Sequence, residues 1–205
     1  MVAMKKLERA LQHGAPAQDD AAIAAERFTR RALDDGLADL AYATVPSPVG
    51  DLLVASSDRG LVRLAYEEGR LEAVLDDLAG RVSPRILESP ARLDAVRRQL
   101  EDYFAGRRRD FDLSLDWRLT RGFGRRVLEA TAQIPYGAAG TYTTVAERAG
   151  SPRAMRATGN ALGANPIAIV IPCHRVLRSS GGLGGYGGGL ERKRFLLELE
   201  GALEN

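Results

Sequence analysis

The chain has 205 residues, which allows one large or two small domains, each with its own hydrophobic core. Its hydrophobic fraction of 45% and charged fraction of 27% are ordinary for a soluble globular protein, and no run approaches the roughly 18 apolar residues of a membrane span. Lys5 and Lys6 are not followed by the apolar stretch of a secretory signal, so we expect a cytoplasmic protein without a membrane partner. The single cysteine excludes an internal disulfide and a cysteine-based zinc cluster, and we expect neither a metal nor a cofactor.

The charge is unevenly distributed along the chain. Residues 117–178 contain nine Arg, no Lys and two acids, a net charge of +7, whereas residues 1–116 carry −4 and residues 179–205 carry −1. A strongly basic segment in a nearly neutral chain fits a surface that faces phosphates. An arginine-rich solvated face is the alternative, and charge alone does not decide between the two.

The first half of the chain predicts an extension followed by a small sheet with helices. Residues 1–40 are rich in alanine and charge, and 19–39 could form a helix, so the extension is expected to be helical or flexible. Turn residues then separate short strand-like runs, which predicts a small antiparallel meander over 41–45, 51–56 and 61–66. Helices are predicted over 70–80 and 90–105, and the second of them carries apolar residues at helical spacing.

The second half is mainly helical. Amphipathic spacing and terminal glycine or proline residues predict helices over 123–133, 143–149 and 152–163, the last with Pro152 at its start. Two short helices joined by a tight turn at Gly150 predict a helix-turn-helix. The second of them carries Arg153 and Arg156 among small side chains, which fits close helix packing, close approach of the backbone to DNA, or both.

Cys173 is the candidate nucleophile. An apolar run over 167–171 predicts a buried strand that leads through Pro172 to Cys173, His174 and Arg175. In an extended chain, neighbouring side chains point to opposite faces, so a bend or a water is needed to join the thiol to the imidazole. An isolated cysteine is usually an inert buried residue. Here the cationic or protonatable neighbours, Arg178 included, favour a lowered thiol pKa and a reactive thiolate.

The sequence Ile-Pro-Cys-His-Arg-Val at 171–176 resembles the active-site signature of the O6-alkylguanine-DNA alkyltransferases, also called methylated-DNA–protein-cysteine methyltransferases. Further segments match the family in order and spacing: 134–137, 141–142, 156–159, 165–166, 185–189, 192–197 and 200–201. The resemblance is strong across 118–201 and weaker across 41–117, and it does not include 1–40. It implies an α+β fold with three parts: the extension 1–40, a small N-terminal antiparallel sheet with helices at 41–117, and a mainly helical DNA-binding and catalytic domain at 118–205.

The resemblance implies repair of DNA by direct reversal. Cys173 would take the alkyl (methyl) group from O6-alkylguanine, with O4-alkylthymine as a further candidate, and would form a thioether once per molecule. His174 would act as the general base through a water, and Glu200 would orient its imidazole. Tyr142 would donate a hydrogen bond to the leaving guanine, and Asn165 would hold the turn before the cysteine. Without the family, we would read Glu200 as a surface acid, Tyr142 as an ordinary aromatic and Asn165 as a turn former.

The remaining site residues concern the substrate and the DNA. The glycine-rich segment 181–189 would line the alkyl pocket, with Tyr186 as part of its wall beside Gly187 and with Val176 near the guanine edge. Arg156 would replace the flipped nucleotide in the stack during minor-groove binding. The further expected DNA contacts are Arg153, Ala154, Ala157 and Arg175. The expected partner is double-stranded DNA that contains alkylated guanine, bound by a monomer that could cluster along it.

Two other functions remain open from the sequence. A non-catalytic lesion binder of the alkyltransferase-like type would flip a damaged guanine without accepting the alkyl group, but such proteins lack the cysteine. A multiple-turnover cysteine hydrolase would give no role to Arg156 or to the basic segment. Gly187 departs from family members that carry a hydroxyl side chain there. Gly124 and Leu128 depart from the Gln and Trp of many bacterial members, where we expect only packing effects.

Overall fold

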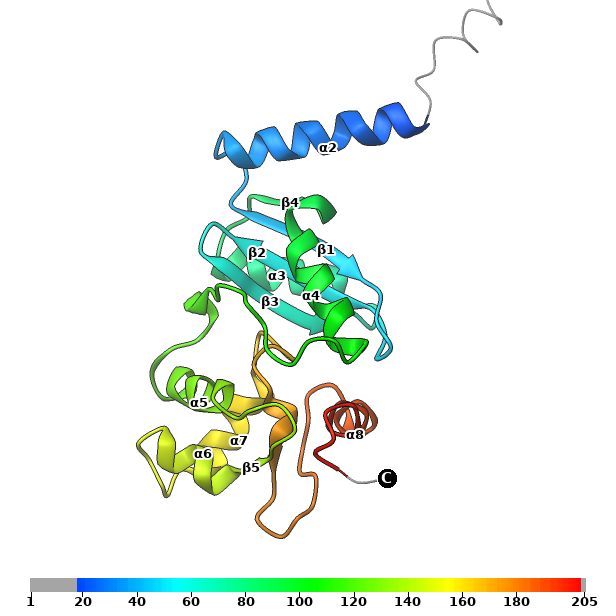
Figure 1. Cartoon of the computed structure of the whole chain (residues 1–205). Helices are drawn as coiled ribbons and strands as arrows, with labels where there is room; N and C mark the ends of the chain where they lie inside the picture. Colours follow the sequence, from blue (N-terminus) through cyan, green and yellow to red (C-terminus); the bar gives the residue numbers. More distant parts are fainter. Residues whose placement is uncertain (1–17, 204–205) are drawn as a thin grey trace, which may run out of the picture.

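The computed structural model describes residues 18–203, so the first 17 residues of the expected extension lie outside the described part. Helix α2 (Gln18–Asp34) precedes the sheet and lies apart from the rest of the molecule, at the top of Figure 1. It ends before Gly36, which has a φ of +70°, and not at residue 39 as the composition suggested. Among the helices of residues 18–203, none has the length and apolar character to cross a membrane.

The sheet is mixed and not purely antiparallel. Strands β1 (Leu40–Val45), β2 (Leu52–Ser57) and β3 (Gly60–Tyr66) form the expected antiparallel meander. Helix α3 (Leu71–Arg81) then carries the chain back, so that β4 (Ile86–Glu88) pairs in parallel with β1 and the strand order is β3-β2-β1-β4. A parallel neighbour requires such a crossover. Because β4 has only three residues, its sequence carried no strand pattern of its own.

Both faces of the sheet are covered (Figure 1). Alternate side chains of β2 point to opposite faces: Leu53 belongs to a small core with Val74 and Leu78 of α3, whereas Leu52 and its neighbours on the other face join the main core. On that main side lie the 3-10 turn η1 (Pro90–Leu93) and α4 (Asp94–Phe104), which together occupy the predicted helix 90–105. The main core continues into the helical part, so one apolar cluster joins the two halves.

The helical part contains the predicted helix-turn-helix. After η2 (Trp117–Leu119) come α5 (Gly122–Ala132), α6 (Tyr142–Arg148) and α7 (Met155–Gly163), with α8 (Leu190–Leu199) near the C-terminus. The third predicted helix begins at Met155 and not at Pro152. Pro152 lies in a turn that the Ala154 N–H closes onto the Ser151 carbonyl at 3.0 Å. The α6–α7 connection is therefore longer than the sequence suggested.

The apolar run before the cysteine is a turn, and the predicted strand at 167–171 is wrong. The Ile171 N–H donates to the Ile167 carbonyl at 3.0 Å, and Ile169 adopts a φ of +69°, a conformation that is uncommon for a β-branched residue. The turn is held from outside, because Leu64 of edge strand β3 donates to Pro166 O at 2.9 Å and accepts from Ala168 N at 3.0 Å. Apolar composition correctly indicated that the three isoleucines are buried, but a turn packed against the core has the same composition as a buried strand.

Candidate active site

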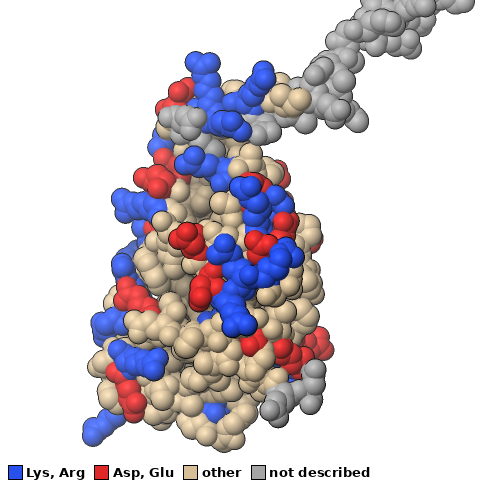
Figure 2. Space-filling model, viewed as in Figure 1, with Lys and Arg blue, Asp and Glu red and all other residues tan. Residues whose placement is uncertain are grey.

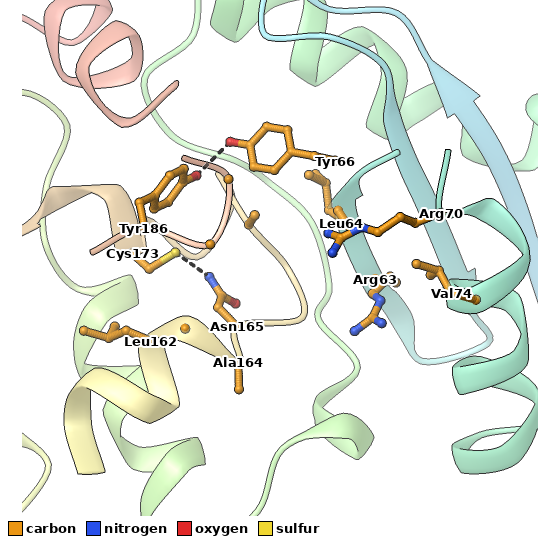
Figure 3. A pocket seen from close by; sticks show the side chains of 16 residues that line it. Arg63, Leu64, Tyr66, Arg70, Val74, Leu162, Ala164, Asn165, Cys173 and Tyr186 are labelled. Carbon is orange, nitrogen blue, oxygen red and sulfur yellow. Dashed lines mark hydrogen bonds between the residues drawn. The ribbon is translucent and has the colours of Figure 1, made fainter. Parts of the chain in front are cut away.

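Cys173 lies directly after this turn and begins a single 3-10 turn, η3 (Cys173–Arg175). Its side chain is buried, with 7% of the residue exposed, yet it borders two cavities. One cavity, of about 290 Å³, is lined by Tyr142 and by Gly159 of α7. The other, of about 390 Å³, lies between the sheet and the active-site turn (Figure 3). The thiol is thus enclosed by protein but open to a molecule that enters either cavity.

Asn165 holds the turn and the thiol together. Its side-chain Nδ2 donates to the Ile171 carbonyl at 2.8 Å and to Cys173 Sγ at 3.1 Å, and its Oδ1 accepts from the Ile167 N–H at 3.0 Å (Figure 3). One amide therefore satisfies both ends of the turn and still reaches the sulfur. A hydrogen bond to sulfur stabilises the thiolate more than the thiol.

The expected lowering of the thiol pKa by basic neighbours is wrong for the free protein. Burial raises the pKa of Cys173, against the opposing effects of the Asn165 hydrogen bond and the positive charge of Lys193. Arg175 does not help to lower the pKa of Cys173, because its guanidinium binds Glu200. The resting group is a thiol, and the reaction requires a base.

His174 and Glu200 form the predicted pair. His174 Nε2 lies 3.0 Å from Glu200 Oε1, and neither side chain is exposed to solvent. Burial lowers the pKa of His174, although the carboxylate opposes this shift, so the imidazole is neutral near pH 7. Its Nδ1 is buried and has no hydrogen-bond partner among the described residues. A neutral imidazole that donates from Nε2 presents Nδ1 as an acceptor, which is the form that a general base requires.

Arg175 belongs to this buried cluster and is not a DNA contact, which corrects its predicted role. Arg175 Nε and Nη2 bind Glu200 at 2.8 and 2.9 Å, and Nη1 donates to the Ile134 carbonyl. Tyr103 of α4 also donates to Glu200 Oε1, at 2.6 Å. Burial raises the pKa of Glu200, but the hydrogen bonds from His174 and Arg175 outweigh it and hold the pKa at about 2. The sequence indicated Tyr103 only as an apolar position of its helix.

Lys193 is a site residue that the sequence reasoning missed. It has no exposed surface, and its Nζ donates to the Val176 carbonyl at 2.6 Å and to the Leu183 carbonyl. Burial lowers its pKa to about 8. Helical spacing could have indicated the burial of Lys193, because positions 193, 196, 197 and 200 share one helix face. The residues at 196, 197 and 200 are also buried. Val176 is itself fully buried, and Lys193 ties its carbonyl to the glycine-rich segment.

Tyr142 is the first residue of α6 and lines the smaller cavity. Its hydroxyl lies 3.5 Å from the Gly185 carbonyl, a contact at the limit of a hydrogen bond. Gly184 has a φ of +70°, and a Cβ atom there would come within 2.8 Å of the Tyr142 hydroxyl. The backbone thus approaches the tyrosine more closely than any side chain would allow.

Tyr186 and Gly187 line both cavities, as expected for a pocket wall. The Tyr186 hydroxyl lies 2.8 Å from the hydroxyl of Tyr66, the last residue of β3 (Figure 3). Arg192 stacks over the Tyr66 ring at 4.5 Å, and a Cβ at Gly188 would lie 2.1 Å from that ring. The wall is therefore positioned by the sheet, and nothing in the sequence pattern marked Tyr66 for this role.

The predicted DNA contacts on α7 and on the turn before it lie at the surface. Arg153, Arg156 and Ala157 are exposed and Ala154 is partly exposed, and within residues 18–203 neither arginine side chain makes a hydrogen bond or an ion pair. Three other arginines of the basic segment form salt bridges that neutralise their charge. The pairs are Arg118 with Asp116, Arg125 with Glu129, and Arg175 with Glu200. In Figure 2, acids and bases alternate over the sheet domain, while the helical part below is largely uncharged on this face.

Family models match both halves of the chain. Residues 40–117 match the ribonuclease-like domain of 6-O-methylguanine DNA methyltransferase, and residues 122–202 match its DNA-binding domain. A methylated-DNA–protein-cysteine methyltransferase of Mycolicibacterium paratuberculosis is 45% identical over 159 residues, 78% of this chain and 91% of that relative. This chain belongs to the O6-methylguanine DNA methyltransferase family.

Solved structures of this methyltransferase family agree with the fold. The O6-methylguanine methyltransferase of Mycobacterium tuberculosis superimposes with a TM-score of 0.68 at 41% identity, over 80% of this chain and 93% of that one. The same organism's protein in complex with DNA superimposes with a TM-score of 0.67 at 41% identity, over 79% of this chain and 93% of that one.

In the described part of our methyltransferase, no cluster of three or more His, Cys, Asp or Glu side chains is placed to hold a metal ion.

Proposed function

We propose that this methyltransferase removes an alkyl group from the O6 of guanine in duplex DNA and keeps it on Cys173, once per molecule. The observation that carries the proposal is the placement of the Cys173 thiol. The sulfur borders two cavities and is bound by Asn165 at 3.1 Å, and His174, the next residue, is paired with Glu200. This is the combination of nucleophile, base and orienting carboxylate that an activated thiol requires.

The reaction is a displacement at the alkyl carbon. A water between the Cys173 thiol and His174 Nδ1 carries the thiol proton to the imidazole, whose positive charge Glu200 stabilises. The thiolate attacks the alkyl carbon, the S–C bond forms, and the C–O6 bond breaks with its electron pair on the guanine. The proton then returns to the guanine, so the products are an S-alkyl cysteine and an unmodified base. A thioether has no good leaving group, which ends the activity of that molecule.

The guanine would occupy the smaller cavity, of about 290 Å³, because that cavity is the one lined by Tyr142 and by Gly159 of α7. There the Tyr142 hydroxyl would donate a hydrogen bond to the base as negative charge develops on it. The smaller cavity is lined by protein on the sides of Gly159 and Tyr142, and a base that is stacked in a duplex must leave the stack to enter such a cavity. Arg156 is exposed on the same helix, without a hydrogen-bond or ion-pair partner among residues 18–203, and would fill the vacated place in the duplex.

One mass measurement tests the proposal. The purified chain is mixed with an excess of duplex that contains O6-methylguanine, and its intact mass is followed with time. The expected gain is one methyl group, about 14 Da, which stops at one per chain and does not occur in Cys173→Ala. Tight binding to the lesion without a gain in mass would indicate a non-catalytic lesion binder instead. Release of product beyond one equivalent per chain would indicate a hydrolase.

A further inference from the structure

The Glu200 carboxylate accepts more hydrogen bonds than its pairing with His174 requires. Arg175 donates from Nε to Oε2 at 2.8 Å and from Nη2 to Oε1 at 2.9 Å. Tyr103 donates to the same Oε1 at 2.6 Å, and His174 Nε2 lies 3.0 Å from it. Three side chains therefore share one oxygen, and Tyr103 makes the shortest of the three contacts.

Tyr103 is the one partner of the three that comes from the sheet domain. It lies on α4, 97 residues before Glu200, and has no exposed surface. Its ring packs against those of Phe104, Phe111 and Tyr136, with centroids 5.3, 5.2 and 6.2 Å from its own. Burial and the neighbouring Glu200 charge raise the pKa of Tyr103, so its hydroxyl stays protonated and donates throughout the working range of pH.

A shared acceptor changes how strongly His174 holds a proton. During the proposed reaction the imidazole takes the thiol proton on Nδ1, and its Nε2–H then becomes a charged donor to Glu200 Oε1. A charged donor binds a carboxylate more strongly than a neutral one, so Glu200 favours the protonated imidazole. A hydroxyl that donates to the same oxygen withdraws negative charge from it and weakens this preference. Tyr103 therefore makes His174 a weaker base.

We propose that Tyr103 positions the Glu200 carboxylate and limits its hold on a proton at His174, so that the imidazole is unprotonated when alkylated guanine arrives. The inference rests on the proposed alkyl transfer and names a residue that sets the strength of its general base. An imidazole that already carries a proton cannot accept the one from Cys173. The Tyr103 hydroxyl keeps its own proton throughout, so the atoms and charges of the transfer step are unchanged.

The other ionisable groups near His174 are the same in a variant that lacks the Tyr103 hydroxyl. Burial lowers the pKa of His174, and the Glu200 carboxylate raises it. The positive charges of Arg175 and Lys193 lower this pKa again. Around the cluster lie Cys173 in η3, Tyr186 with its ring 6.5 Å from the imidazole, and Tyr136 beside the Arg175 guanidinium.

The test follows single-turnover transfer from duplex O6-methylguanine between about pH 5 and about pH 8. The rate should fall in acid as His174 takes a proton, and the midpoint of this acid limb reports the pKa of the imidazole. Tyr103→Phe removes the hydroxyl and keeps the ring. We expect the midpoint to move to higher pH by about half a pH unit or more, because Glu200 then holds the protonated imidazole more strongly.

Tyr136→Phe is the matched control. The Tyr136 hydroxyl donates to the Leu199 carbonyl at 2.9 Å, one residue before Glu200, and not to the carboxylate. Loss of this hydroxyl should reduce stability without moving the acid limb. If Tyr103 acted only by packing, Tyr103→Phe would behave in the same way.

A second substitution covers the case in which Tyr103→Phe does not fold. A fluorotyrosine in place of Tyr103, with fluorine next to the hydroxyl, keeps the shape of the side chain and is a stronger donor, because fluorine makes the phenol more acidic. It should move the midpoint to lower pH. NMR titration of His174 in the His13→Gln background, where it is the only histidine of the chain, measures the same shifts without DNA.

An acid limb at the same pH in the wild type, Tyr103→Phe and the fluorotyrosine protein would overturn the inference. Equal shifts in Tyr103→Phe and Tyr136→Phe would also overturn it. The NMR titration keeps the two proposals separate, because it does not depend on transfer. If the wild type takes no methyl group, the proposed function is wrong; if it does and neither measurement moves, only the role of Tyr103 is wrong.

Discussion

The hydroxyl oxygens of Tyr66 and Tyr186 lie 2.8 Å apart and connect the end of β3 to the wall of the reactive pocket. The two residues are separated by 120 positions in the chain. The sheet domain thus contributes directly to the site, in addition to the β3 backbone hydrogen bonds that hold the turn before Cys173. Burial raises the pKa of Tyr66 to about 12, so its hydroxyl stays protonated across the working range of pH.

We expect Tyr66→Phe to loosen this wall. The substitution leaves the Tyr186 hydroxyl without its partner, which should lower the free energy of unfolding by about 1 kcal/mol. Transfer of bulky O6 substituents should slow several-fold more than transfer of methyl, because only large groups depend on the position of the wall. Denaturant unfolding and single-turnover rates measure the two effects. Tyr42→Phe is the control, since the Tyr42 hydroxyl makes no hydrogen bond among the described residues; equal effects of both changes would contradict the role of Tyr66.

Asn165 offers a test of how the thiol is activated. Asn165→Ala removes the hydrogen bonds to the turn and to Cys173 Sγ, which should cost about 1–3 kcal/mol of stability and raise the thiol pKa. Asn165→Asp retains a side chain of the same shape but places a negative charge near the sulfur. It should raise the thiol pKa more than alanine does. The pH dependence of Cys173 alkylation by iodoacetamide measures this order, and a lower thiol pKa in the Asp variant would refute the account.

Stability should fall in acid in two stages. His174 has a pKa below its usual 6.5 in the folded protein, so the unfolded chain binds more protons as the pH falls below 6.5, and folding loses stability. The pKa of Glu200 is held at about 2 against a usual value of 4.5, so a second loss follows as the pH falls from 4.5 towards 2. Urea unfolding from pH 8 to pH 3 measures both stages.

Glu200→Gln separates these contributions. The variant lacks the carboxylate, so the loss of stability below pH 4.5 should be smaller than in the wild type, although its stability at pH 7 is reduced because Arg175 is left buried without its counter-charge. An unchanged acid slope would show that Glu200 is not bound to His174 and Arg175 in solution. The transfer rate at pH 7 should fall by a factor of about 10² or more, as expected when a general base loses its orienting group.

Arg156→Ala should distinguish base extrusion from chemistry. We expect repair of O6-methylguanine in duplex DNA to slow by a factor of at least about ten, while reaction with free O6-benzylguanine is nearly unchanged, because only the duplex has a stack to refill. Arg59→Ala, at a surface away from α7, is the control and should affect neither substrate. Single-turnover rates on the two substrates measure the split. Similar losses on both would assign Arg156 to catalysis or folding.

Much of the site was predictable because it is local in sequence. Cys173 and His174 are adjacent, Asn165 lies eight residues before the thiol, and the spacing of apolar side chains predicted α5, α6 and most of α7. The spacing of apolar residues along the sequence distinguishes helix from strand, because side chains return to the same face with a different period in each. The single cysteine and the excess of arginine are likewise properties of the sequence alone.

Tertiary structure decided the features that depend on contact between distant segments. The apolar residues 167–171 indicated burial equally well for a strand and for a turn, and pairing with Leu64 selected the turn. The sequence predicted Arg175 as a basic DNA contact, but in the folded protein Arg175 is buried and binds Glu200. Tyr103, 97 residues before Glu200 in the chain, binds the same carboxylate. Local sequence does not encode such partners, because they come together only when the whole core closes.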